Sequence, residues 1–304
     1  MADALAANFP QAKIDFLVNK RVAELVFDYS NINKVHTIEK ESEIGKICKK
    51  YGYDLAIIVN PKFEIAWQVY KSWIKYRLGT SNRWYSFLFN IRHKQHRKYS
   101  LKNEMEYNLD LLDELKCNKL KGLKPNLKVK DEYLTKIKNY LYNLGVPAVK
   151  SFIVVHIPTL GSAKVWSDSN FVKFIDLLEG QIPIILTGTS VDNPQISNVM
   201  KRLKTPQNVY PVTNISLSEL FALLKISKLF IGNSSGPIHI AAAAGTFVVG
   251  LYSPVKVESL TRWGPVTDKK KIFAPQKDDD SRDVMDDIKP ENVAGFVLEY
   301  IRLD

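Results

Sequence analysis

Short apolar runs rich in β-branched residues alternate with helical patterns along the chain, and this alternation constrains the fold more than any other feature. The runs occupy residues 14–18, 55–59, 152–156, 182–187, 209–212, 229–231 and 248–252. Continuous apolar strands joined by helices are typical of βαβ units, in which a parallel sheet is covered on both faces. We therefore predict an α/β fold of doubly wound domains with parallel sheets.

Helical spacing of apolar residues marks the segments between these runs. Helices are predicted over 23–28, 105–115, 132–144, 168–178, 193–203 and 218–226. Gly145 is placed as a stop signal. Ser216 is a predicted cap, because Glu219 follows three residues later.

The length of 304 residues suits two domains of ordinary size. Pro125 and Pro147 lie in the segment that connects the two halves. We predict an N-terminal domain over 1–147, a second domain over 148–290 and a C-terminal helix over 291–304 that packs back on the first domain.

Cys48 and Cys117 lie far apart, in no spacing typical of metal or redox sites. No stretch approaches the roughly 20 apolar residues that cross a bilayer, and the N-terminus lacks a signal-peptide layout. A cytoplasmic protein is the expectation.

Positive charge is concentrated in the first half. The net charge is +11, and residues 1–150 hold 27 Lys/Arg against 16 Asp/Glu. Between Glu64 and Glu104 there is no acidic residue, while cations alternate with Trp, Tyr and Phe. A nucleic-acid site, an anionic membrane surface or a phosphorylated acceptor would each fit this segment. A solvated face of a lysine-rich protein fits it too.

The strongest local pattern is an apolar strand at 229–231, followed by Gly232-Asn233-Ser234-Ser235-Gly236 and a helix that opens at Pro237. Proline is favoured in the first helical turn, and N–H groups with serine hydroxyls at a helix N-terminus attract anions. His239, in the first turn, could add a ring nitrogen. The pattern favours a phosphate site, although glycine-serine turns before helices are also common in purely structural roles.

Two further loops follow predicted strands. The first carries Thr159, Ser162, Lys164 and Trp166, and Lys164 could neutralise a phosphate while Thr159 and Ser162 donate hydrogen bonds. The second, which includes Thr187 and Gly188, could line a nucleotide pocket. The alternative for the first loop is that Trp166 packs in the core and Lys164 is solvated.

Residues 229–252, which read LFIGNSSGPIHIAAAAGTFVVGLY, closely resemble the signature of glycosyltransferase family 9, the ADP-heptose:lipopolysaccharide heptosyltransferases. The Lys164/Trp166 loop, the Thr187-Gly188 turn and the segment 8–18 resemble further family features in the same order. The resemblance implies a GT-B fold of two facing Rossmann-like domains, with the donor bound in the C-terminal domain.

Carried over by position, Ser235, Gly236 and His239 match the family's phosphate-contacting turn, and Lys164 matches its phosphate-binding lysine. Ser234, which also belongs to the predicted phosphate turn, stands where the family usually has Asp. The family's catalytic Asp lies in a Gly-Asp loop about twenty residues ahead of the position matched by Phe9-Pro10. No residue here matches it, so the catalytic residue is unknown, and Asp3 falls in a helix. We expect the natural protein to begin upstream, since loss of the first strand would expose an unpaired sheet edge and an apolar helix face.

The resemblance implies an inverting, metal-independent transfer of a heptose-like sugar from a nucleotide diphosphate donor, ADP-heptose favoured, to lipopolysaccharide core or a related glycan. No cofactor is expected. Arg92, Arg97 and Lys98 are then a predicted acceptor or membrane surface, at the inner face of the cytoplasmic membrane. Alternatives are a nucleotide-sugar-binding protein without efficient turnover, a sugar-nucleotide epimerase, and nucleic-acid binding through the basic segment.

Overall fold

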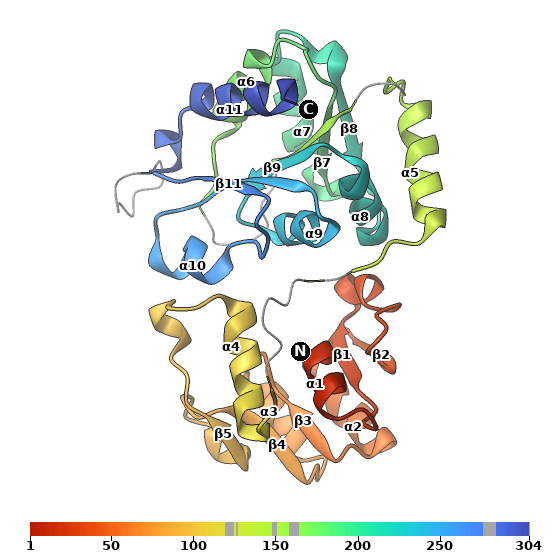
Figure 1. The fold of residues 1–304 in the computed structure, drawn as a ribbon, viewed down its shortest axis with the longest axis vertical. Coiled ribbons are helices and arrows are strands. Elements are labelled where there is room, and N and C mark those ends of the chain that lie inside the picture. The colour runs from red at the N-terminus through yellow and green to blue at the C-terminus, as the bar shows by residue number, and fades with distance from the viewer. Residues whose placement is uncertain (119–124, 126, 148–150, 158–163, 276–283, 304) are drawn as a thin grey trace. The chain divides into compact units, whose positions relative to one another are not determined.

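The computed structural model describes residues 1–118, 125, 127–147, 151–157, 164–275 and 284–303. The chain forms two compact units, Met1–Leu123 and Lys124–Asp304 (Figure 1). This division lies earlier than the predicted boundary after residue 147. The reason is helix α5 (Asp131–Asn143), which packs against α8 (Leu217–Ile226) of the second unit.

The first unit contains two small parallel sheets. Strand β1 pairs with β2, and β3, β4 and β5 form a three-stranded sheet. Its helices and strands are α1 (Ala2–Asn8), β1 (Asp15–Asn19), β2 (Lys34–Ile38), α2 (Ile44–Tyr51), β3 (Leu55–Ile57), α3 (Phe63–Tyr70), β4 (Tyr76–Thr80), β5 (Ile91–His93) and α4 (Glu104–Asp110).

Helix α1 is covered within this unit. Ala4 and Leu5 are buried against Leu109, Leu112 and Cys117. The prediction of an exposed apolar helix face was therefore wrong, because these later residues supply the covering surface.

The second unit is a six-stranded parallel sheet in the order β11-β10-β9-β6-β7-β8. Its remaining elements are β6 (Ile153–His156), α6 (Asp168–Leu177), β7 (Ile184–Gly188), α7 (Asn193–Arg202), β8 (Val209–Thr213), β9 (Leu229–Asn233), α9 (Gly236–Ala244), β10 (Phe247–Leu251), α10 (Leu260–Trp263), β11 (Lys270–Phe273) and α11 (Pro290–Arg302).

Both faces of this sheet are buried. Strand residues that point to opposite faces, such as Val154 and Val155, are both fully inaccessible. On one face α6, α7 and α11 complete the core; the other carries α8 and α9, with α5 packed on α8 (Figure 1). The predicted doubly wound parallel fold is confirmed. Helix α11 packs on α6 of the same unit, and the prediction that the C-terminal helix packs back on the first domain stays a prediction.

Candidate functional site

The candidate site lies where the strand order of the large sheet reverses. The chain runs from β6 outward through β7 to β8 and then returns to β9 on the other side of β6. The carboxyl ends of β6 and β9 are in register, with His156 beside Gly232. Ligands of open α/β sheets bind outside the carboxyl ends of the strands at such a switch point.

Gly232 permits the close approach of these two strands. A Cβ atom at this position would lie 3.1 Å from the His156 carbonyl oxygen and 3.0 Å from the Phe230 ring. A side chain at this position would therefore be tightly packed against the β6 backbone just before the candidate turn.

Asn233 ties the turn after β9 to the loop after β6. Its Oδ1 accepts a hydrogen bond from the Trp166 backbone N–H at 3.0 Å, and its Nδ2 donates to the Ile157 carbonyl at 3.4 Å. Asn233 is 1% exposed, so both bonds are shielded from water. The predictions missed this role, although a polar residue directly at the end of an apolar strand was a signal for it.

Trp166 and Lys164 belong to the loop after β6, and hydrogen bonds to other segments hold both residues. The Trp166 ring is buried, and its Nε1–H donates to the Ile288 carbonyl at 2.8 Å. Lys164 donates its backbone N–H to a Glu258 carboxylate oxygen at 3.1 Å. Glu258 is thus a site residue that the predictions missed. Thr159 and Ser162, predicted in this loop, lie outside the described residues.

Ser235 is the N-cap residue of α9, yet its side chain makes no capping bond. Its Oγ is one of three side-chain oxygens in the described part of the chain that are buried without a hydrogen-bond partner. Buried hydroxyls normally have partners. At the N-terminus of α9, where the helix dipole is positive, an anion would supply one.

Gly236 and His239 belong to the same turn. A Cβ at Gly236 would meet no atom within 4 Å, so packing does not require glycine there. His239 is exposed in the first turn of the helix. The structure thus brings Ser235, Gly236 and His239 together at one helix N-terminus, as the spacing predicted, and their contact with a donor stays a prediction.

Ser234 is anchored to the neighbouring strand. Its backbone N–H donates to the Leu251 carbonyl at 3.2 Å. Its hydroxyl bonds the buried hydroxyl of Tyr252, whose pKa is raised by burial and only partly lowered again by that bond. The backbone N–H and the hydroxyl of Ser234 thus have protein partners, and its predicted donor contact stays a prediction.

Thr187 was predicted to line a nucleotide pocket, but its side chain faces the protein interior. It is 2% exposed; its Oγ1 lies 3.0 Å from His156 Nδ1, and its hydroxyl donates to the Val155 carbonyl at 3.4 Å. Burial lowers the pKa of His156 to about 4, so the ring is neutral at neutral pH. The Thr187 side chain thus belongs to the core of the unit, and its predicted place in a nucleotide pocket stays a prediction. Gly188 ends β7 at the same edge and is half-buried.

Of the three residues predicted to form a basic surface on the first unit, Arg97 is largely buried. Arg97 is 11% exposed; its guanidinium forms an ion pair with Glu104 and donates to Asn108 Oδ1 at 3.0 Å. Its guanidinium is therefore held within the unit, and its predicted role in an acceptor or membrane surface stays a prediction. Arg92 donates from Nε to the Phe89 carbonyl at 2.8 Å, and Lys98 lies over the Tyr99 ring at 5.0 Å.

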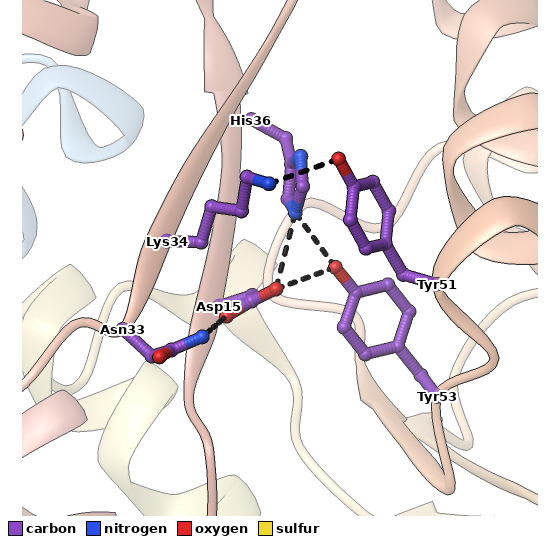
Figure 2. Close-up of polar contacts among 6 residues, drawn as sticks. All are labelled: Asp15, Asn33, Lys34, His36, Tyr51 and Tyr53. Atoms are coloured by element: carbon purple, nitrogen blue, oxygen red, sulfur yellow. Dashed lines mark hydrogen bonds and ion pairs between the residues drawn. The ribbon is translucent and has the colours of Figure 1, made fainter.

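A second polar cluster, which the sequence did not indicate, joins β1, β2 and the segment after α2. Figure 2 shows a triangle of Asp15, His36 and Tyr53. Tyr53 donates to Asp15 Oδ2 at 2.8 Å, and His36 Nε2 lies 3.1 Å from the same oxygen and 2.8 Å from the Tyr53 hydroxyl oxygen. Asn33 Nδ2 donates to the other Asp15 oxygen at 2.8 Å.

This cluster of Asp15, Asn33, His36 and Tyr53, here called the Asp15 clasp, has a structural role. Burial would raise the pKa of Asp15, but hydrogen bonds from Asn33, Tyr53 and His36 outweigh it and lower that pKa. Burial and the Asp15 hydrogen bond raise the pKa of Tyr53. Asp15 opens β1, so the cluster lies at the amino end of the strand, opposite to the edge at which such sheets bind ligands.

Comparison with known proteins places the chain among sugar transferases. Residues 42–289 match the model of glycosyltransferase family 9 (heptosyltransferase). A putative glycosyltransferase of Haemophilus influenzae is 29% identical over 257 residues, 79% of this chain and 71% of the relative. The lipopolysaccharide heptosyltransferase 3 of Escherichia coli is 22% identical over 264 residues, 82% of this chain and 77% of that protein.

The fold has solved counterparts. The structure of the Escherichia coli ADP-heptose lps heptosyltransferase II superposes with a TM-score of 0.82 at 18% identity, over 99% of this chain and 93% of that one. The predicted GT-B class of fold is thereby confirmed.

Proposed function

The chain belongs to glycosyltransferase family 9, and from this premise we propose that it transfers a heptose-like sugar from a nucleotide diphosphate donor to a lipopolysaccharide-core glycan or a related acceptor. ADP-heptose is the favoured donor. The names of two similar Escherichia coli proteins, lipopolysaccharide heptosyltransferase 3 and ADP-heptose lps heptosyltransferase II, support this choice. The acceptor oxygen forms a bond to the anomeric carbon with inversion, the bond to the diphosphate breaks, the hydroxyl proton passes to a general base, and no metal takes part.

The observation that carries the proposal is the buried Ser235 hydroxyl, which has no protein partner at the N-terminus of α9. The departing diphosphate gains negative charge as the glycosidic bond breaks. Donors already fixed in place around that charge stabilise the transition state, a contribution often worth about 3 kcal/mol per donor. We assign this role to Ser235, Gly236 and His239, with Lys164 as the cation.

The general base remains unassigned. Asp3 lies in α1, where its carboxylate accepts hydrogen bonds from the Tyr29 hydroxyl at 2.5 Å and from Asn31 Nδ2 at 2.7 Å. A carboxylate held by these neighbours has a sufficient structural role, and we leave it out of the mechanism.

The cellular location that we propose follows from the acceptor. A glycolipid acceptor would place the enzyme at the inner face of the cytoplasmic membrane as a peripheral protein. Among the described residues, no helix is both long and apolar enough to span a bilayer.

A thermal-shift panel of ADP-, UDP-, GDP- and CMP-sugars tests the proposal, because a ligand that binds only the folded state stabilises it, by about 2.7 kcal/mol at 100 times Kd. We expect ADP-heptose to raise the midpoint, and Ser235→Ala to weaken that shift while the free protein melts as before. No shift with any donor would refute the proposal. A shift without sugar transfer to any glycolipid would instead indicate a nucleotide-sugar-binding protein.

A further inference from the structure

Helix α3 carries a row of aromatic residues along one side, where Phe63 is partly buried against the core of the unit and Trp67 and Tyr70 are exposed. Ala66 and Val69 are buried on its inner face. Phe63, Trp67 and Tyr70 follow one another at spacings of four and three residues, which places them on one side of the helix.

These three rings and Trp84 form a continuous stack, here called the aromatic ladder. Ring centroids are 4.9 Å apart for Trp84 and Phe63, 6.3 Å for Phe63 and Trp67, and 5.9 Å for Trp67 and Tyr70. The interplanar angles are 26°, 16° and 16°, so neighbouring rings lie nearly parallel.

Much of this aromatic surface is open to water. Trp84 is 74% exposed, Tyr70 44% and Trp67 39%. Trp73, in the turn after α3, is 90% exposed and has a positive φ of 59°. Bulky residues rarely adopt this backbone conformation, and core packing does not account for it because the side chain is almost fully exposed.

Cations lie over two rings of the aromatic ladder and over the ring of Tyr76, which opens β4. Lys71 Nζ lies 5.3 Å from the centroid of the Trp67 ring, the Arg77 guanidinium 5.3 Å from that of Tyr70, and Lys75 Nζ 5.1 Å from that of Tyr76. Residues 65–103 contain nine Lys/Arg and no Asp or Glu. A partner that covers this surface must therefore accept both apolar rings and positive charge.

We propose that the aromatic ladder, with Trp73, Lys71 and Lys75, docks the protein on the surface of an anionic phospholipid bilayer. Trp and Tyr are enriched where a membrane meets water, and lysines beside them attract the negative surface of the lipid headgroups. The inference rests on the proposed function only in that a glycolipid acceptor requires contact with a membrane; docking itself needs neither donor nor acceptor.

Ring stacking within the ladder favours a bilayer over a nucleic acid or a free glycan. Bases bind by stacking on an open aromatic face. Phe63 has Trp84 and Trp67 as stacking neighbours, and Trp67 has Phe63, Tyr70 and the Lys71 ammonium. The inner rings therefore present mainly their edges, which suit insertion among headgroups.

Vesicle co-sedimentation of the full chain tests the proposal. The probes are phosphatidylcholine vesicles with and without phosphatidylglycerol, both free of glycolipid. We expect binding only to the anionic vesicles. The double variant Trp73→Ser/Lys75→Glu should reduce partitioning at least about ten-fold, since each basic residue near such a surface contributes about five-fold.

The matched control is Tyr142→Ser/Lys138→Glu, which removes one exposed aromatic ring and reverses one exposed lysine on α5. It should bind anionic vesicles as the parent does. Brominated lipids should also quench the fluorescence of the parent more than that of the folded Trp73→Ser variant, and equal thermal midpoints would establish folding.

Failure of the parent to bind anionic vesicles, or equal loss in the test and control variants, would overturn the proposal. So would binding of a single-stranded oligonucleotide, lost in the test variant, in the absence of vesicle binding. The donor panel separates the two proposals: a donor shift without vesicle binding refutes only docking, and vesicle binding without a donor shift refutes only the proposed function.

Discussion

Asn233 and Ser235 lie two positions apart in one turn, yet only the side chain of Asn233 has hydrogen-bond partners within the protein. Asn233 uses Oδ1 and Nδ2 to join the turn to the loop after β6, while the Ser235 hydroxyl is buried without a partner. The first residue joins the two segments of the candidate site, and the second is the one that we propose contacts the donor's diphosphate.

Asn233→Ala should destabilise the protein and weaken donor binding. The substitution leaves the buried Trp166 N–H without its acceptor, which typically costs about 1–3 kcal/mol. Chemical denaturation measures the loss, and the donor thermal shift measures binding. The control Asn208→Ala removes a bond to the Gly180 carbonyl elsewhere in the unit and should lower stability alone. Unchanged donor binding in Asn233→Ala would contradict the assigned role.

The Asp15 clasp predicts a pH dependence of stability (Figure 2). Its pKa is lower in the folded than in the unfolded chain, so the carboxylate stabilises the fold above the unfolded value of about 3.9. This contribution is lost as pH falls through the lower folded pKa. Asp15→Asn should therefore reduce the free energy of unfolding at pH 7 by about 1–3 kcal/mol.

Denaturation curves at several pH values check this expectation. The difference between parent and Asp15→Asn should shrink below about pH 4. Asp54→Asn, at an exposed position, should change stability little at any pH. A difference between parent and Asp15→Asn that stays constant from pH 7 to pH 3 would show that the charge of Asp15 does not contribute.

Among the elements, α8 shows how a local pattern and a distant partner act together. Ser216 and Glu219 form the predicted capping box, and the Ser216 hydroxyl accepts from the Glu219 N–H at 3.2 Å. Glu219 also pairs with Lys136 of α5 at 2.5 Å. The sequence showed the cap because its two residues are neighbours, but the ion pair depends on how α5 packs.

Ser216→Ala should lower the free energy of unfolding by about 1 kcal/mol, because the first turn of α8 loses its cap. Lys136→Ala should cost less than about 1 kcal/mol, because the lysine side chain is 70% exposed and water screens the pair. Thermal or urea denaturation measures both. A larger loss for Lys136→Ala than for Ser216→Ala would reverse this ranking.

At the scale of the whole molecule, each unit has its own buried apolar core. The candidate donor residues all lie in the second unit. A donor should therefore slow amide hydrogen exchange most at the carboxyl edge of β6 and β9, where ordering of the turn and loop reduces local opening. Exchange measured by mass spectrometry checks this, and protection confined to the first unit would contradict the assigned site.

The sequence by itself determined the features whose interactions are local. Alternating apolar runs predicted the parallel strands of the second unit, and the glycine-serine turn before Pro237 predicted the start of α9. Backbone conformation and helix capping depend on residues close along the chain, so one segment suffices to show them. The family signature extended this prediction to the GT-B fold.

The tertiary structure decided the features that require distant residues to meet. Thr187 is hydrogen-bonded to His156, Arg97 forms an ion pair with Glu104, and Asp15 is hydrogen-bonded to His36 and Tyr53. Whether a polar side chain faces solvent, a ligand or a protein partner depends on packing across the sheet and between helices. Contacts between residues distant in the sequence determine this environment. For this reason the sequence pattern indicated the elements that carry these residues but not the partners that they contact.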